Sequence, residues 1–232
     1  MSFLLAVESS TKHLSVALFE EGRLLEEIVA VSDGTVSQGR THSEKLLPLI
    51  DQILNARQFK IADIRSFAVA VGPGSFTSLR VGMATVMGLA CGTGSAIYPV
   101  SSLKAMALGV AGDGVLIAPV IKGGRGRVYG AVYQRKGRTV KQRIKQATYE
   151  PEGFLAKIKK LKQKIFFVGP GFEILGVRSG PKNIYLDYVF PRASQVGFLA
   201  INEKIKPIRP EGLRIRYLQE PGLGGKIQGV KP

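Results

Sequence analysis

The chain is poor in the residues that build metal and redox sites. Its 232 residues include one cysteine, Cys91, and two histidines, His13 and His42. No HxxxH or CxxC pattern occurs, so the ligand spacing typical of zinc sites is missing. A single cysteine cannot form a disulfide framework, which fits a reducing compartment. We therefore expect no metal site and a cytoplasmic location.

Motifs for nucleophilic catalysis, nucleotide binding and membrane insertion are also missing. The sequence has neither a GxSxG nucleophile elbow nor the GK[ST] of a Walker-type loop. The longest apolar stretch, residues 75–92, is marginal for a membrane span, and Arg80 and several glycines argue against one. The N-terminus has no basic segment and is typical of a strand rather than a signal peptide. We expect no catalytic residues and no contact with a membrane.

Acidic residues are scarce in the second half of the chain. The formal net charge is +16. Residues 1–110 contain nine basic and nine acidic residues, whereas residues 111–232 contain 24 basic and eight acidic residues. Between Val115 and Tyr149 there are nine basic residues and no acidic one. This asymmetry predicts an anionic partner, with nucleic acid as the first candidate.

The sequence does contain an order of strands and helices that occurs twice. Both halves read βββαβα, and Val-Gly-Pro-Gly follows the fourth strand at 71–74 and again at 168–171. We predict two duplicated α/β lobes with mixed sheets flanked by helices, at 1–110 and 111–218, followed by a disordered tail at 219–232. The expected strands are 3–8, 14–19, 24–31, 67–71, 96–100, 115–121, 127–134, 138–145, 165–168 and 184–186, and the expected helices are 42–57, 75–91, a short one from 102, 151–161 and 193–201.

The helix expected at 75–91 has almost no charge. Arg80 is its only charged residue, and small residues recur at Ser78, Gly82, Ala84 and Gly88. A surface helix normally carries a charged face, so something must cover this one on more than one side. Three alternatives stay open. The helix is central to the protein's own core, or its first turn binds a phosphate, or its exposed side docks against a helix of another protein.

Polar and glycine-rich turns follow the strands that lead into each helix. Glu8-Ser9-Ser10-Thr11 ends the first strand and offers one carboxylate and three hydroxyls. Such a turn could hold a phosphate and a metal-bound water, or it could be a hydrogen-bonded turn with no ligand, which we favour. The candidate phosphate-binding residues are Glu8, Ser9, Ser10, Thr11, Gly72, Gly74, Gly169 and Gly171.

Cations alternate with tyrosines in the basic part of the second half. Strand periodicity would place residues 125, 127, 129, 131, 133 and 135 on one face. Cations interleaved with aromatic rings suit RNA, because charge follows phosphates and rings stack on unpaired bases. The alternative is a solvated face with long side chains. The candidate RNA-binding residues are Arg125, Arg127, Tyr129, Tyr133, Arg135, Lys141, Arg143 and Lys145.

Several segments resemble those of the bacterial TsaB (YeaZ) family. The resemblance covers about residues 3–218, and its most specific part is the block from Gly72 into the following helix. The later segments match a weaker pattern. The matching segments are AVESST (6–11), HSEKLLPLIDQIL (42–54), AVAVGPGSFTSLRVGMATVMGLA (68–90), YPVSSLKAMA (98–107), RVYGAVY (127–133) and PIRPEGLRIRYLQEP (207–221).

This resemblance implies the actin-like ATPase (ASKHA) superfold and a function. TsaB proteins are regarded as non-catalytic subunits of the machinery that makes threonylcarbamoyladenosine beside the anticodon of tRNA. They pair with the TsaD transferase, work with the ATPase TsaE, and form homodimers through the same surface. The implied interface is the first two helices, here Ser43–Arg57 and Ser75–Cys91. The implied contact residues are Ser43, Leu46, Leu47, Ile50, Ile53, Leu54, Ser75, Phe76, Thr77, Leu79, Arg80, Gly82, Met83, Val86 and Met87.

One loop departs from the family pattern. Residues 122–129 stand where the family usually has acidic-Ala-Arg-x-Gly-Glu-Val-Tyr, so two acids are replaced by bases and the family arginine by Gly124. This change weakens any case for site chemistry there and favours contact with RNA. Two other functions stay open: a nucleotide-binding ATPase or kinase of the same superfold and, more remotely, a glycoprotease-like metallopeptidase. The expected cofactor is none, with weak or absent nucleotide binding.

Overall fold

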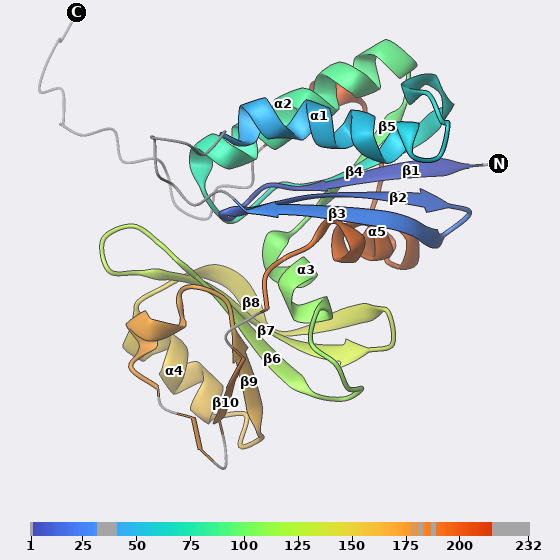
Figure 1. The fold of residues 1–232 in the computed structure, drawn as a ribbon. Coiled ribbons are helices and arrows are strands. Elements are labelled where there is room, and N and C mark those ends of the chain that lie inside the picture. Colours follow the sequence, from blue (N-terminus) through green and yellow to red (C-terminus); the bar gives the residue numbers. More distant parts are fainter. Residues whose placement is uncertain (1, 32–40, 178, 181–182, 187–188, 215–232) are drawn as a thin grey trace, which may run out of the picture.

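Two five-stranded mixed sheets form the protein in the computed structural model, which describes residues 2–31, 41–177, 179–180, 183–186 and 189–214 (Figure 1). The expected polar segment 32–40 and tail 219–232 lie outside the described residues. The first sheet has the order β3-β2-β1-β4-β5 and the second the order β10-β9-β6-β7-β8. In each sheet three strands pair antiparallel and two more join in parallel, so the predicted duplication is confirmed.

The elements follow the expected order closely. In the second lobe, the one-turn helix η2 takes the place that α2 has in the first, because Gly176 ends it with a φ of 60°. The first lobe contains β1 (Phe3–Glu8), β2 (His13–Glu20), β3 (Arg23–Val31), α1 (His42–Asn55), η1 (Ile61–Asp63), β4 (Ile64–Ala70), α2 (Phe76–Thr93), β5 (Ala96–Val100) and α3 (Ser102–Leu108). The rest comprises β6 (Leu116–Lys122), β7 (Val128–Lys136), β8 (Thr139–Tyr149), α4 (Pro151–Lys159), β9 (Ile165–Val168), η2 (Phe172–Leu175), β10 (Asn183–Leu186), α5 (Ala193–Asn202) and η3 (Pro210–Gly212).

Local chemistry defines the ends of the two helices that matter most. The Ser75 hydroxyl accepts a hydrogen bond from the Ser78 N–H at 3.4 Å and caps α2; from the sequence, either Ser75 or Thr77 could have been the cap. Gly94, with a φ of 67°, ends the same helix. At the start of α1, the Thr41 N–H donates to the Glu44 carboxylate at 2.6 Å. Both helices therefore start at a capping residue, and α2 also ends at one.

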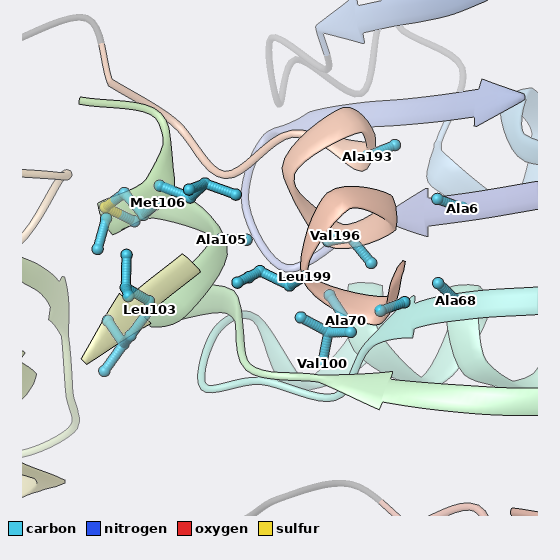
Figure 2. Packing of buried hydrophobic residues seen from close by; sticks show 14 of the residues in the cluster. Ala6, Ala68, Ala70, Val100, Leu103, Ala105, Met106, Ala193, Val196 and Leu199 are labelled. Carbon is cyan, nitrogen blue, oxygen red and sulfur yellow. The ribbon is translucent and has the colours of Figure 1, made fainter. Parts of the chain in front are cut away.

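One hydrophobic core runs through both lobes. α1 and α2 cover one face of the first sheet, and α5 covers its other face (Figure 1). There α5 meets α3, and Val196 and Leu199 pack in one buried cluster with Ala6 and Ala68 of the first sheet and Met106 of α3 (Figure 2). The cluster continues into the second sheet. The two lobes are thus joined by packed apolar side chains.

The end of the described chain returns to the first lobe. The α5 helix lies in the sequence half assigned to the second lobe, yet it packs against β1, β2, β4 and β5. Ile208 then exchanges backbone hydrogen bonds with Ile97 of β5, at 2.8 and 2.9 Å. Residues 193–213 were predicted to belong to the second lobe, but they pack on the first. Strand and helix patterns in a sequence do not show which sheet an element will cover.

Because α5 packs closely on the first sheet, adding a side-chain atom at their contact should lower the free energy of unfolding. A Cβ at Gly197 would lie 2.2 Å from Cε2 of the Phe19 ring, so Gly197→Ala should destabilise the protein by about 1–3 kcal/mol. Gly88→Ala is the matched control, because nothing lies within 4 Å of its Cβ position, and it should be neutral or stabilise by up to about 1 kcal/mol. Urea unfolding measures both, and equal stability of the two variants would contradict the packing.

Candidate functional site

The residues implied as partner contacts divide into a buried group and an exposed group. The structure corrects the buried group, because these side chains fill the protein's own core between the helices and the first sheet and present little or no surface to a partner. The sequence could not make the distinction, since a helix without a charged face does not show which side points outward. The buried residues are Leu46, Ile50, Ile53, Leu54, Leu79, Gly82, Met83 and Val86.

The exposed group lies on the outside of α1 and α2. It is nearly uncharged on α2, whereas on α1 the exposed residues Glu44 and Asp51 stand one turn before and after Leu47. Leu47 is 50% exposed, Phe76 39% and Met87 38%, which is unusual for large apolar side chains. The one cation in this group, Arg80, lies with its guanidinium carbon 3.7 Å from the centroid of the Phe76 ring. The implied contacts Ser43, Ser75 and Thr77 are also exposed. We call the following residues the outer strip: Leu47, Phe76, Arg80, Ala84, Met87 and Gly88.

Small residues of α2 serve two different purposes. A Cβ at Gly82 would lie 2.3 Å from the Ser9 hydroxyl, so this glycine lets α2 pack onto the turn between β1 and β2. Gly74, just before the helix, is equally constrained, because its Cβ would lie 2.3 Å from the Ser10 carbonyl oxygen. Gly88 has open space around it. Of these three glycines, only Gly88 leaves the surface of α2 flat toward solvent.

The β1–β2 turn is a hydrogen-bonded structure rather than an open phosphate site. The Ser9 hydroxyl donates to the Ser78 carbonyl at 2.9 Å, and the Ser75 N–H donates to the Ser10 carbonyl at 2.8 Å. Thr11 accepts from the His13 N–H at 3.2 Å. These groups are engaged by the protein itself. The four residues Glu8, Ser9, Ser10 and Thr11 are all buried.

The glycine turns are similarly closed. Gly72 and Gly169 are buried and have φ values of 102° and 97°, which favour glycine. The Gly171 N–H donates to the Val120 carbonyl at 3.0 Å, and a Cβ there would lie 2.6 Å from the carbonyl carbon of Ile121. The structure therefore favours glycine turns that pack within the protein over glycine turns that hold a phosphate.

Glu8 has the most perturbed environment of the candidate residues. Its side chain is fully buried, and Oε1 accepts a hydrogen bond from the Ser10 N–H at 2.5 Å. No hydrogen-bond partner for Oε2 lies among the described residues. Burial raises the pKa of this carboxyl to about 7, partly opposed by hydrogen bonding with Ser10. The described residues hold no group of three or more His, Cys, Asp or Glu that could bind a metal ion.

The face of β7 that was expected to bind RNA packs against the protein's own core. Tyr133 is fully buried in the core, and its hydroxyl donates to Gln146 at 3.1 Å. Arg135 donates to the carbonyls of Leu108 and Val110 after α3, which ties β7 to that loop. The interpretation of Tyr133 as an RNA contact is wrong, and the half-buried Arg135 is engaged by backbone carbonyls. The alternation of β7 itself holds, because residues 129, 131 and 133 face one core cluster and residues 128 and 132 face the other. What the sequence could not show is that β7 is an inner strand whose two faces are both covered.

The other candidates are more accessible. Tyr129 is half-buried and packs against the core. Arg127 is exposed but forms an ion pair with Glu150 at 2.6 Å. Arg125 lies in the turn between β6 and β7 with a φ of 56°. The exposed cations among the candidates are Arg125, Arg127, Lys141, Arg143 and Lys145. No described helix is long and apolar enough to cross a membrane.

The buried carboxyl of Glu8 predicts a specific pH dependence. Because the folded-state pKa of about 7 exceeds the ordinary value of 4.5, the stability linked to Glu8 is complete below pH 4.5 and is lost as the pH rises through 7. Glu8→Gln keeps the acceptor for the Ser10 N–H but cannot ionise. Between pH 4.5 and 8, the wild type should lose about 3 kcal/mol of unfolding free energy relative to the variant. Parallel slopes in urea unfolding across this range would contradict the burial of an ionisable Glu8.

Comparison with known proteins gives consistent matches. The sequence model of TsaD, described as tRNA N6-adenosine threonylcarbamoyltransferase, matches residues 26–190. The tRNA threonylcarbamoyladenosine biosynthesis protein TsaB of Escherichia coli is 30% identical over 188 residues, which cover 76% of this chain and 76% of that protein. TsaB of Bacillus subtilis is 28% identical over 166 residues, covering 72% and 70%.

A solved structure gives the same match in three dimensions. YeaZ from Pseudomonas aeruginosa superposes with a TM-score of 0.77 at 25% identity, covering 94% of this chain and 100% of that one. The two mixed sheets with their flanking helices have the actin-like ATPase-type fold that the resemblance implies. With this fold, and with 30% identity over about three quarters of both sequences, the chain belongs to the TsaB (YeaZ) family.

Proposed function

We propose that this chain is a non-catalytic subunit of the machinery that makes N6-threonylcarbamoyladenosine beside the anticodon of tRNA. The outer strip carries this proposal, because it is an exposed apolar surface on a helix whose only cation lies over an aromatic ring. The relatives named above are biosynthesis proteins for this modified nucleoside, and the matching sequence model is named for its transferase. The protein would work where tRNA is modified, in the cytoplasm.

The partner on the outer strip is a TsaD-type transferase subunit. A flat, uncharged helix surface suits the close approach of another apolar helix, and burying it removes large apolar side chains from water. A second copy of this chain could occupy the same strip and form a homodimer in the absence of the transferase. A TsaE-type ATPase would join the resulting complex, and tRNA would be its substrate.

The lack of catalytic equipment supports a binding role. The Ser9 hydroxyl and the Ser10 carbonyl of the β1–β2 turn are engaged by backbone atoms of α2 and its N-cap, and Glu8 is sealed from solvent. A general base must reach the proton that it removes, and a buried carboxyl cannot do this without rearrangement. The transferase chemistry would therefore reside on the partner.

The outer strip is tested by placing a large cation on its flat part. Gly88→Arg should abolish comigration with the cognate TsaD-type subunit in gel filtration, because the guanidinium would have to be buried in an apolar interface. Its stability should stay close to that of the wild type, since Gly88 is exposed and has open space around it. Gly82 is unsuitable for this experiment, because a side chain there would displace the β1–β2 turn.

Gly153→Arg is the matched control for this variant. Gly153 is exposed in the first turn of α4, on the other lobe, and also has no atom within 4 Å of its Cβ position. This variant should comigrate with the partner as the wild type does. Comigration of both variants would exclude the outer strip as the interface, whereas loss of comigration in both would show a general effect of added charge.

We also propose that the chain has no nucleotide cofactor, against the alternative of an ATPase or kinase of the same fold. The glycine turns and the β1–β2 turn pack within the protein, and the two lobes share one apolar core. Calorimetry with Mg-ATP at millimolar concentration should give no binding heat. A saturable binding heat would support the nucleotide-binding alternative instead.

A further inference from the structure

Exposed cations gather where β8 and α4 meet on the second lobe. β8 is an outer strand of its sheet, and α4 packs across β7 and β8 (Figure 1). Ile144 of β8 packs against the apolar cluster that contains Ile158 of α4, so the two elements share one core. We call the following exposed residues the basic margin: Lys141, Arg143 and Lys145 of β8, and Lys157, Lys159 and Lys160 at the end of α4.

The pairing of β8 is irregular where its exposed cations lie. The pairing of β7 with β8 shifts register twice, once between Gly130 and Val132 and once between Val132 and Tyr133. Tyr133 faces Gln142 and Val132 faces Ile144, so Arg143 is an extra residue on the outer strand. Such bulges increase local twist and re-aim side chains. The simple alternation expected from the sequence is therefore interrupted at the centre of the basic margin.

The basic margin is not neutralised by the protein. Among the described residues, none of its six cations has a carboxylate within 4.0 Å, whereas Arg127 pairs with Glu150. The strands β6, β7 and β8 contain no acidic residue. Lysines on an outer strand often serve only to prevent pairing with other sheets. That purpose does not account for the additional unpaired cations at the end of α4.

We propose that the basic margin binds the phosphate backbone of RNA and that it does so without reading bases. The identity of the RNA as tRNA rests on the proposed function. Base recognition in single strands commonly uses exposed aromatic rings as stacking platforms, but Tyr133 is buried, Tyr129 is half-buried, and the Tyr149 ring stacks on Phe154. The margin thus offers charge without a stacking platform, which positions an RNA but does not select its sequence.

The test is a titration of fluorescently labelled tRNA transcript with the full chain, followed by anisotropy. With four or five phosphate contacts, the affinity should fall roughly 10²-fold between about 50 and 200 mM salt. The variant Lys141→Glu/Arg143→Glu/Lys145→Glu should bind at least about tenfold more weakly, and its slope of log affinity against log salt should fall by about three. An unrelated RNA of equal length should compete as well as tRNA does.

Arg23→Glu/Lys60→Glu/Arg65→Glu is the matched control, because it changes the same formal charge at exposed positions of the first lobe. It should retain most of the affinity. Equal weakening by both variants would show an effect of net charge alone and overturn the proposal, as would a flat salt response. Competition by tRNA only would overturn the claim that bases are not read.

This experiment separates the RNA surface from the partner surface. The basic margin lies on the second lobe, whereas the outer strip lies on α1 and α2 of the first. The β8 variant should therefore still comigrate with the TsaD-type subunit, and Gly88→Arg should still bind RNA. Normal RNA binding by the β8 variant overturns the RNA proposal alone, and loss of comigration in the β8 variant overturns the separation of the two surfaces.

Discussion

The packing of α3 and α5 between the two sheets is the constraint on which the rest of the structure depends. Leu103 and Met106 of α3 and Val196 and Leu199 of α5 fill the space that separates the lobes (Figure 2). This shared core joins the lobes, and Glu8 and its turn are buried in the same molecule. In our proposals, the protein partner and RNA therefore bind to outer surfaces: the apolar outer strip on the first lobe and the basic margin on the second.

Most of the fold could be predicted from the sequence because its signals are local. Alternating and continuous apolar runs, the Ser75 cap and the repeated Val-Gly-Pro-Gly turns define strands and helices without reference to distant residues. The sheet against which α5 packs could not be predicted in this way. Its apolar residues show that it is buried, but only packing against Phe19 and the first sheet decides where.

The candidate sites were harder to predict because exposure depends on tertiary packing. The α2 helix lacks a charged face, so the sequence could not separate Met83, which is buried, from Met87, which is exposed. On β7 the alternation pointed to Tyr133 as a surface residue, yet both faces of this strand are covered. The exposed positions of β8 were predicted better, since long charged side chains on an outer strand have no alternative to solvent.

The central claim is that the partner is recognised through the outer strip while the space between the lobes stays closed. Hydrogen–deuterium exchange of the chain with and without its TsaD-type subunit tests this directly, because it reports protection peptide by peptide. The account predicts new protection in α1 and α2, with no change in the β1–β2 turn or in α3. Protection confined to the β1–β2 turn and α3, with α1 and α2 unchanged, would contradict it.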